Sequence, residues 1–104
     1  GPSDPASAAP AGGPAMLTRT VLVPNRRGLH ARAAAKFVTL ASSQPVEVHV
    51  AKDGSEVTGT SIMGLMMLAA AKGTVIELET EGADEAAAMQ ALTDLINDYF
   101  GEGE

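Results

Sequence analysis

A strictly alternating segment in the middle of the chain constrains the fold more than any other feature. In residues 46–51 (VEVHVA), every second residue is valine, and Glu47 and His49 stand between the valines. This is the pattern of a strand with one buried and one solvent-facing side. Asp53-Gly54 follows closely and suits a tight hairpin turn with positive φ at both central positions. We therefore expect residues 56–60 to return as the paired strand.

Two more segments have the composition of strands. Residues 17–23 (LTRTVLV) are rich in β-branched side chains and stop at Pro24-Asn25, which is a turn signal. Residues 74–80 (TVIELET) stop at Glu81-Gly82 in the same way. Together with the helical segments, the order is β-α-β-β-α-β-α. A hairpin combined with several helices predicts an antiparallel or mixed sheet with the helices on one face, an α+β two-layer sandwich.

Three segments have the periodicity and the ends of helices. Residues 31–42 consist mainly of good helix formers. Residues 62–72 follow Ser61, a hydroxyl N-cap, and end in a lysine just before Gly73. Asp84 can cap a last helix that extends almost to the end of the chain. The residues expected on the buried faces are Ala34, Phe37, Val38 and Ala41 in the first helix and Ala88, Leu92, Leu95 and Tyr99 in the last.

Length and composition limit the classes of function. A chain of 104 residues has room for one compact domain, whose core contains few aromatic residues. The absence of cysteine excludes disulfides, thiolate catalysis and Cys-based metal sites, and it fits a reducing compartment. No apolar run reaches the roughly 20 residues that span a bilayer. A net charge of -6 disfavours a general nucleic-acid binder, which needs many contacts from Lys and Arg to phosphates.

The beginning of the chain differs in composition from the rest. Residues 1–15 (GPSDPASAAPAGGPA) lack the basic and apolar regions of a signal peptide. We expect this segment to be a disordered leader or the remnant of an expression vector. Residues 16–104 are then expected to form the single domain.

Positive charge gathers around one histidine. Four of the seven Lys and Arg residues fall in one stretch that also contains His30, and these four are Arg26, Arg27, Arg32 and Lys36. In a chain that is acidic overall, this arrangement predicts a site for a small anionic group.

The position of His30, directly before the first predicted helix, suits phosphate chemistry. The first N–H groups of a helix have no intrahelical partners and carry partial positive charge, so they can hold a phosphate. Arg32 lies in the first turn, and Gly28 allows a tight loop and a close approach of a partner's backbone. A neutral imidazole is nucleophilic, and the phosphoramidate that it forms is reactive enough to be passed on. Transfer of this kind needs little from the protein beyond positioning and charge.

Two segments together resemble the HPr family, the histidine-containing phosphocarriers of the phosphoenolpyruvate phosphotransferase system. They are GLHARAAAKFV at residues 28–38 and TSIMGLMMLAAAKGT at residues 60–74. The similarity in motifs and element order extends from Leu17 to about Phe100. It implies an open-faced sandwich of a four-stranded antiparallel sheet with three helices on one face. It also implies a monomeric, cytoplasmic protein with no cofactor and no bound metal.

The resemblance further implies a reaction and its residues. His30 is expected to be phosphorylated through Nδ1 by enzyme I, itself charged from phosphoenolpyruvate, and to donate to enzyme IIA-type acceptors. Arg32 is expected to steady the phosphoryl group. The residues expected to support phosphate binding are Arg26, Arg27, Gly28, Ala31 and Ala33. Those expected to dock partner proteins are Ile62, Met63, Met66, Met67 and Lys36.

The chain departs from the family pattern at Ala33, where members usually have proline. A first-turn proline costs no helical hydrogen bond and presets φ, so the start of this helix is expected to differ in rigidity. Ala33 and the pair Arg26-Arg27 resemble the branch of the family that serves regulatory chains. Ser61 corresponds to a second site, which an HPr kinase/phosphorylase modifies in some members. A phosphate there would add about two negative charges to a docking surface.

Several plainer interpretations remain open. Ser61 is by default only a helix cap, and the methionines are more often core than interface. His49 is expected to be solvated on the outer side of its strand, and the two histidines make a poor metal pair. The chain could also be a regulatory module that binds target enzymes through its first two helices. A phosphohydrolase is disfavoured because no carboxylate accompanies His30 in the motif and no enclosing pocket is evident.

Overall fold

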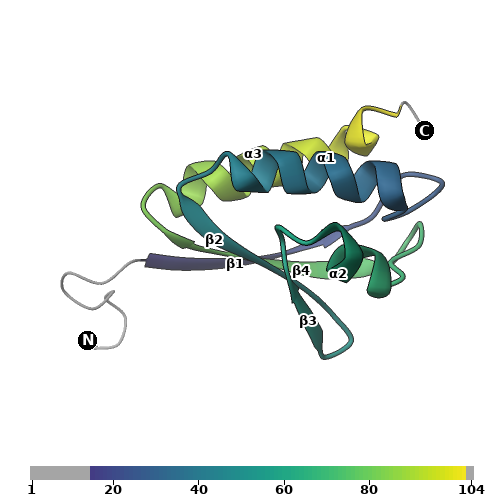
Figure 1. Cartoon of the computed structure of the whole chain (residues 1–104), viewed down its shortest axis with the longest axis horizontal. Helices are drawn as coiled ribbons and strands as arrows, with labels where there is room; N and C mark the ends of the chain where they lie inside the picture. Colours follow the sequence, from purple (N-terminus) through teal and green to yellow (C-terminus); the bar gives the residue numbers. More distant parts are fainter. Residues whose placement is uncertain (1–14, 103–104) are drawn as a thin grey trace.

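The chain forms a four-stranded antiparallel sheet with helices on one face, and the computed structural model describes residues 15–102 (Figure 1). The strands are β1 (Ala15–Leu22), β2 (Val46–Lys52), β3 (Ser55–Thr58) and β4 (Val75–Gly82). The helices are α1 (Ala31–Ser42), α2 (Ile62–Met67), α3 (Glu85–Asn97) and the short 3₁₀ turn η1 (Tyr99–Gly101). The predicted α+β architecture is confirmed. The expected leader lies outside the described residues, except that Ala15 already belongs to β1.

The sheet has the order β1-β4-β2-β3, with every neighbouring pair antiparallel. The predicted hairpin joins β2 to β3, and its turn residues Asp53 and Gly54 have φ of 51° and 85°. Val48 and Val50 are buried against the helices, whereas Glu47 and His49 lie on the uncovered face. The alternation in the sequence is therefore confirmed as the division between a core face and an open face.

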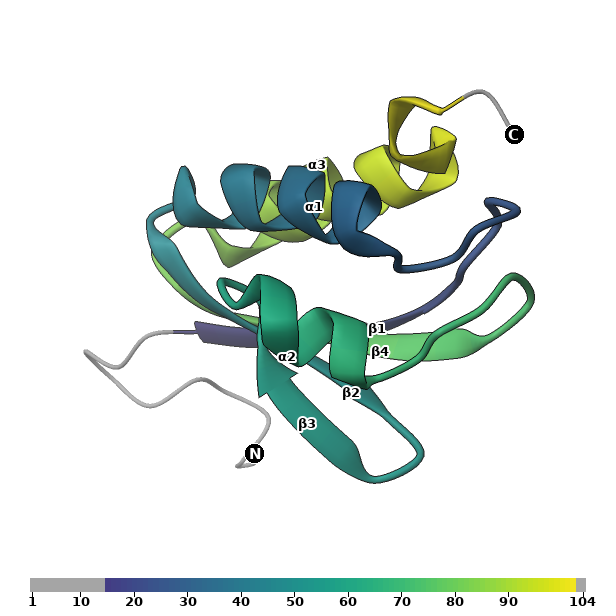
Figure 2. The same ribbon diagram turned by 45° about the vertical axis from the view of Figure 1, so that its right-hand side comes forward.

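The core lies between the sheet and helices α1 and α3. Phe37 of α1, Leu78 of β4 and Ile96 of α3 are among its fully buried members. Aromatic side chains are few, so small aliphatic residues bring the layers into contact, as at the buried Ala34 and Ala88. Helix α2 packs against α1 and β3, at the side of the two longer helices (Figure 2). None of the described helices is long and apolar enough to cross a membrane.

The second helix is much shorter than its sequence predicts. The composition favours a helix up to residue 72, but α2 ends at Met67, and Ala69 takes the left-handed conformation with φ of 54°. The amine of Lys52 donates to the carbonyls of Leu68 and Ala69, at 2.9 and 3.3 Å, and so satisfies the helix end. The carbonyl of Ala70, which lies beyond the end of α2, accepts from the backbone N–H of Leu29 in the loop before α1. Tertiary hydrogen bonds therefore override the helix propensity of the alanines.

The end of the last helix also differs from the prediction. Asp84 is the N-cap of α3, but it has φ of 59° and its side chain makes no capping hydrogen bond. Helix α3 stops at Asn97, and the following turn reverses the chain through positive φ at Tyr99, Phe100 and Gly101. As a result Phe100 is fully buried and Tyr99, which helical spacing predicts on the buried face, is 39% exposed.

Candidate functional site

His30 is the N-cap of α1, as the sequence predicts. Its backbone is extended, its carbonyl accepts the first intrahelical hydrogen bond from Ala34 at 2.8 Å, and its Nδ1 accepts from the backbone N–H of Ala33 at 3.1 Å. The imidazole side chain is 21% exposed. The ring therefore faces the first turn of α1 and remains partly accessible, so Nδ1 lies where the unpaired amides of the helix start converge.

The other ring nitrogen of His30 faces a carboxylate. Its Nε2 lies 2.7 Å from Oε2 of Glu102, whose side chain is 14% exposed. The second carboxylate oxygen, Oε1, accepts from Nδ2 of Asn25 at 3.1 Å. The carboxylate thus covers Nε2, which is buried without a hydrogen bond of regular geometry. Both ring nitrogens and both oxygens of Glu102 have specific neighbours.

The left-handed turn after α3 brings Glu102 to this position. Phe100 anchors the turn in the core, and the amine of Lys36 donates to the Phe100 carbonyl at 2.8 Å. The backbone N–H of Glu102 closes the turn on the carbonyl of Tyr99 at 2.9 Å. Lys36, expected to dock partners, therefore holds the turn after α3 against α1.

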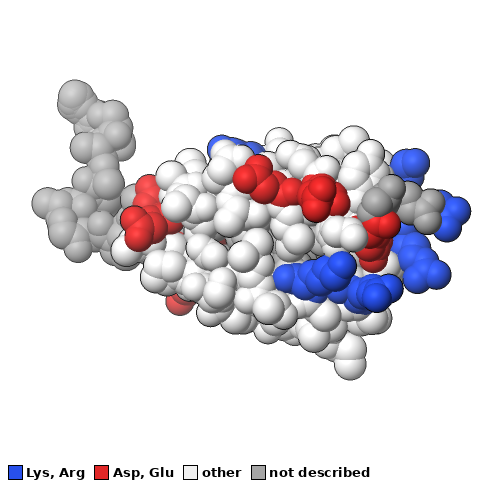
Figure 3. Space-filling view, turned by 90° about the horizontal axis from the view of Figure 1, so that it is seen from above, with Lys and Arg blue, Asp and Glu red and all other residues white. Residues whose placement is uncertain are grey.

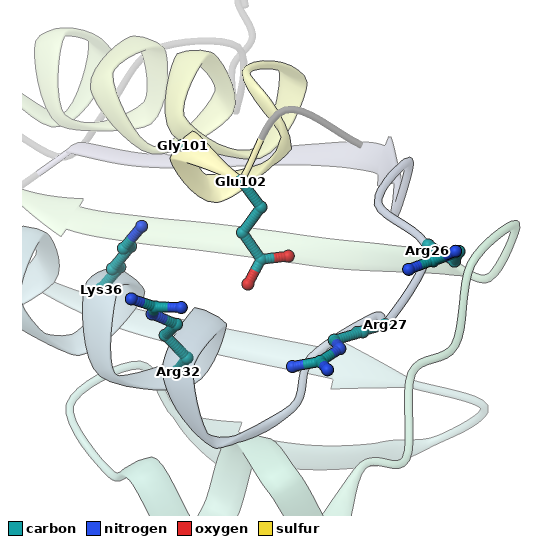
Figure 4. A pocket seen from close by; sticks show the side chains of 6 residues that line it. All are labelled: Arg26, Arg27, Arg32, Lys36, Gly101 and Glu102. Atoms are coloured by element: carbon teal, nitrogen blue, oxygen red, sulfur yellow. The ribbon is translucent and has the colours of Figure 1, made fainter.

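A basic hollow of about 370 Å³ is lined in part by Glu102, the residue that contacts His30. It is lined by Arg26, Arg27, Arg32, Lys36, Gly101 and Glu102. The carboxylate of Glu102 extends into the hollow, with Lys36 and Arg32 on one side and Arg27 on the other (Figure 4). Seen from the helix side, the cations gather at the end of the molecule where α1 begins (Figure 3). The four cationic residues that the sequence places near His30 are thus brought together.

The loop before His30 is fixed by internal hydrogen bonds. The fully buried Asn25 donates from Nδ2 to the carbonyl of Gly28 at 2.9 Å, and the N–H of Leu29 donates to Ala70 at 2.9 Å. Gly28 has φ of +66°, and a Cβ built there would lie 2.3 Å from the Ala70 carbonyl oxygen. The backbone that comes close to Gly28 in this structure is thus that of Ala70 in the same chain.

The remaining predicted residues of the phosphate site occupy the first turn of α1. Ala31 and Arg32 are exposed, and Ala33 is fully buried. Ala33 retains the N–H that proline would lack, and this group donates to the Nδ1 of His30. The departure from the family pattern therefore adds one hydrogen bond to the ring.

The predicted docking residues of α2 form an exposed apolar surface. Ile62, Met63, Met66 and Met67 are exposed, with Met67 at 78%, whereas Leu65 fills the core. The alternative that these methionines are core residues is therefore wrong. Ser61 caps α2 by accepting from the N–H of Gly64 at 3.0 Å.

On the open face of the sheet, His49 has closer neighbours than the sequence suggests. Its Nδ1 lies 3.2 Å from Glu56 and its Nε2 lies 3.5 Å from Glu47. Donor atoms of His49, Glu56 and Glu79 all lie within 4.8 Å of one another. Strand pairing brings these residues together from β2, β3 and β4.

Sequence reasoning missed Glu102. The sequence offers no carboxylate near His30, and this absence was one ground for disfavouring a hydrolase; the structure removes that ground. Neither composition nor spacing signals the contact, because it depends on a turn with three consecutive residues of positive φ. The glycine at 101 is the single local sign that the chain reverses there.

Comparisons with known proteins agree with the motifs. The family model described as "PTS HPr component phosphorylation site" matches residues 17–98. The phosphocarrier protein HPr of Neisseria meningitidis serogroup A is 67% identical over 89 residues, covering 86% of this chain and all of that protein. HPr of Cupriavidus necator is 49% identical over the same shares. The crystal structure of HPr-C-His from Thermoanaerobacter tengcongensis superposes with a TM-score of 0.79 at 45% identity, covering 83% of this chain and 97% of that one.

Proposed function

The chain belongs to the HPr family of phosphocarriers of the phosphotransferase system, and we propose that its His30 carries the phosphoryl group. In this proposal, phosphorylated enzyme I donates to His30 in the cytoplasm, and an enzyme IIA-type protein accepts from it. The observation that carries the proposal is the position of Nδ1, which faces the amides at the start of α1 next to a hollow lined by four cations.

The contacts of the ring support attack by Nδ1. Because Nδ1 accepts a hydrogen bond from Ala33, it bears the lone pair of the neutral ring, and the proton resides on Nε2. During transfer, Nδ1 forms a bond to phosphorus while the bond from phosphorus to the donor atom of enzyme I breaks, and that donor atom keeps the electron pair. The proton stays on Nε2, so the His30 ring becomes positively charged. Donation to the acceptor reverses these steps.

The cations around the hollow supply charge for the transferred group. As the phosphoryl group joins Nδ1, its oxygens can accept hydrogen bonds from the backbone N–H groups of the first turn of α1, including that of Ala33. Arg32 lies in that turn, and Arg27 reaches the hollow from the loop before His30. Guanidinium groups suit this task because they donate several hydrogen bonds to phosphate oxygens.

The exposed apolar surface of α2 is the proposed docking site for both partners. Ile62, Met63, Met66 and Met67 surround the exposed side of a helix that packs beside α1. Flexible methionine side chains can repack against surfaces of different shape. A carrier that must bind a donor and an acceptor in turn needs such a surface.

Ser61 is a proposed regulatory site at the start of this surface. A phosphate on Ser61 would add about two negative charges next to the docking methionines, and so weaken binding of partners with acidic or apolar surfaces. The hydroxyl is engaged as the cap of α2, and α2 has only six residues, so its dipole contributes little. The effect of modification is therefore expected to be on docking.

Incubation with enzyme I and labelled phosphoenolpyruvate tests the carrier function. The protein is expected to acquire an acid-labile, base-stable phosphoryl group, to lose this ability on His30→Ala substitution, and to pass the label to an enzyme IIA-type protein. His49→Ala, which changes the other histidine, serves as the matched control. Persistent labelling of the His30→Ala variant would exclude the proposed site.

The same variants separate this function from that of a purely regulatory binding module. A module that acts by binding alone predicts that His30→Ala leaves both target binding and signalling unchanged. The phosphocarrier predicts that binding persists while every step that requires transferred phosphate is lost.

A further inference from the structure

We propose that Glu102 is a positioning residue for His30, which keeps the imidazole proton on Nε2 and directs the phosphoryl group to Nδ1. In the same proposal, the carboxylate stabilises the positively charged ring once the phosphoryl group is attached. This inference rests on the proposed phosphocarrier function.

The first line of evidence is the division of roles between the two ring nitrogens. Nδ1 accepts from a backbone N–H, so it cannot carry a proton in the neutral ring, and Nε2 must carry it. The carboxylate of Glu102 lies 2.7 Å from Nε2, so its negative charge faces the ring nitrogen that carries the proton. A carboxylate in this position favours the tautomer in which Nδ1 is the nucleophile. The carboxylate of a catalytic triad fixes the tautomer of its histidine in the same way.

The second line of evidence is that Glu102 is itself held in place. Asn25, which is fully buried, donates to Oε1, and Phe100 and Lys36 fix the turn that presents the side chain. The exposed fraction of the Glu102 side chain is 14%. An exposed surface carboxylate without such partners would gain little from one contact.

The third line of evidence is the charge balance of the hollow. Arg26, Arg27, Arg32 and Lys36 attract the phosphoryl oxygens, but they also disfavour a positive ring beside them. Glu102 is the carboxylate that lines this hollow, and it lies at the ring edge away from the start of α1. It can therefore offset the repulsion on the ring while leaving the Nδ1 edge to the phosphoryl group.

Retention of the proton on Nε2 matters for donation as well. If the ring leaves phosphorus with Nε2 protonated, the leaving group is a neutral imidazole. If Nε2 has lost its proton, the leaving group is an imidazolide anion, which is a much poorer one. Glu102 therefore keeps the phosphoryl group transferable, in addition to selecting the nitrogen that carries it.

The experiment uses potassium phosphoramidate, a chemical donor that needs no enzyme I. Wild type, Glu102→Ala, Glu102→Gln and the control Asp98→Ala are phosphorylated, and NMR identifies the phosphorylated ring nitrogen in each. Asp98 is an exposed acidic residue near the same end of the chain, and its side chain caps nothing. The rate of dephosphorylation is then followed as a function of pH.

Wild type and Asp98→Ala are expected to carry phosphate on Nδ1. Glu102→Ala uncovers Nε2 and is expected to give a mixture of both isomers, whereas Glu102→Gln, whose amide is close in size to the carboxylate and can still cover Nε2, is expected to retain Nδ1. Both Glu102 variants lose the negative charge beside the ring and are expected to donate the phosphoryl group more slowly than wild type and Asp98→Ala at alkaline pH.

The proposal is overturned if Glu102→Ala gives the isomer and the pH profile of wild type. It is equally overturned if Asp98→Ala changes both as much. Failure of enzyme I to phosphorylate the wild-type protein, with the chemical results as expected, would instead remove the phosphocarrier function and leave the positioning role of Glu102 intact.

Discussion

The backbone N–H of Ala33 donates a hydrogen bond to Nδ1 of His30 across 3.1 Å, at the point where the ring would receive a phosphoryl group. The nucleophilic lone pair is therefore occupied before transfer, and the same N–H is available to a phosphoryl oxygen afterwards. The second bond involves a charged acceptor and is the stronger of the two. The N–H of residue 33 thus stabilises the phosphorylated protein more than the free protein.

Ala33→Pro removes this donor and is expected to shorten the lifetime of the phosphohistidine. The difference between a charged and a neutral hydrogen bond, about 1 kcal/mol, corresponds to about a fivefold faster loss of phosphate. Release of inorganic phosphate from the purified phosphoprotein measures it. Ala33→Gly keeps the N–H and is the control; if it loses phosphate as fast as the proline variant, the N–H is not responsible.

Gly28→Ala is expected to lower the free energy of unfolding by roughly 2–5 kcal/mol, because it combines left-handed strain with overpacking. The added Cβ would lie 2.3 Å from the Ala70 oxygen at φ of +66°. Gly73→Ala is the matched control, since Gly73 has φ of +87° but no atom within 4 Å of an added Cβ. It should cost only about 1–2 kcal/mol in urea denaturation. Equal losses in the two variants would contradict the close packing at Gly28.

Phe100→Ala is expected to lower the free energy of unfolding by about 3–5 kcal/mol, because it empties a fully buried aromatic site. Tyr99→Ala changes the neighbouring aromatic residue, which is 39% exposed, and should cost about 1 kcal/mol or less. Thermal or denaturant unfolding of the pair measures which residue is in the core. The opposite ranking would mean that α3 continues as a regular helix.

Ser61→Ala removes the acceptor for the Gly64 N–H and is expected to cost about 1 kcal/mol of stability. Ser61→Asp keeps an accepting oxygen and should remain within about 0.5 kcal/mol of wild type. If phosphorylation of Ser61 acts on docking, Ser61→Asp should also be labelled more slowly by enzyme I. A large loss of stability in Ser61→Asp would indicate that charge at this position disturbs the fold itself.

Met67→Asp tests the docking surface without altering the core. Met67 is 78% exposed, so its replacement should change the free energy of unfolding by no more than about 0.5 kcal/mol. Labelling by enzyme I at low protein concentration is expected to slow about tenfold, the effect of losing an apolar anchor worth roughly 1.5 kcal/mol. Labelling by phosphoramidate should not change. A parallel loss in both reactions would place the effect at His30 rather than in docking.

The sequence predicts those parts of the fold that depend on local patterns. The alternation of Val48 and Val50 and the Asp53-Gly54 turn define the hairpin, and the helix formers after His30 define α1; all of these are confirmed. The predicted length of α2 was wrong because Lys52 binds the Leu68 carbonyl, which a helix up to residue 72 would use itself, and because Ala69 turns left-handed. Such hydrogen bonds join residues far apart in the chain, so local helix propensity cannot predict them.

The candidate site also has a part that local sequence predicts and a part that it does not. His30, Arg32 and the preceding loop are contiguous, so the motif brings them together. Glu102 and Asn25 enter from opposite ends of the described chain and meet only through the turn after α3. Their contact could not be predicted from spacing, since the decisive φ angles at Tyr99 and Phe100 belong to residues that seldom adopt them.

The turn after α3 has a practical consequence for anyone who handles this protein. Because Glu102 contacts His30 directly, a fluorophore attached at Gly101 or Glu102 would lie next to the reactive ring. Ala15, the first residue of β1, pairs with Gly82 at the far end of the sheet (Figure 1). A label attached at the exposed Met16, next to Ala15, would therefore lie far from the imidazole.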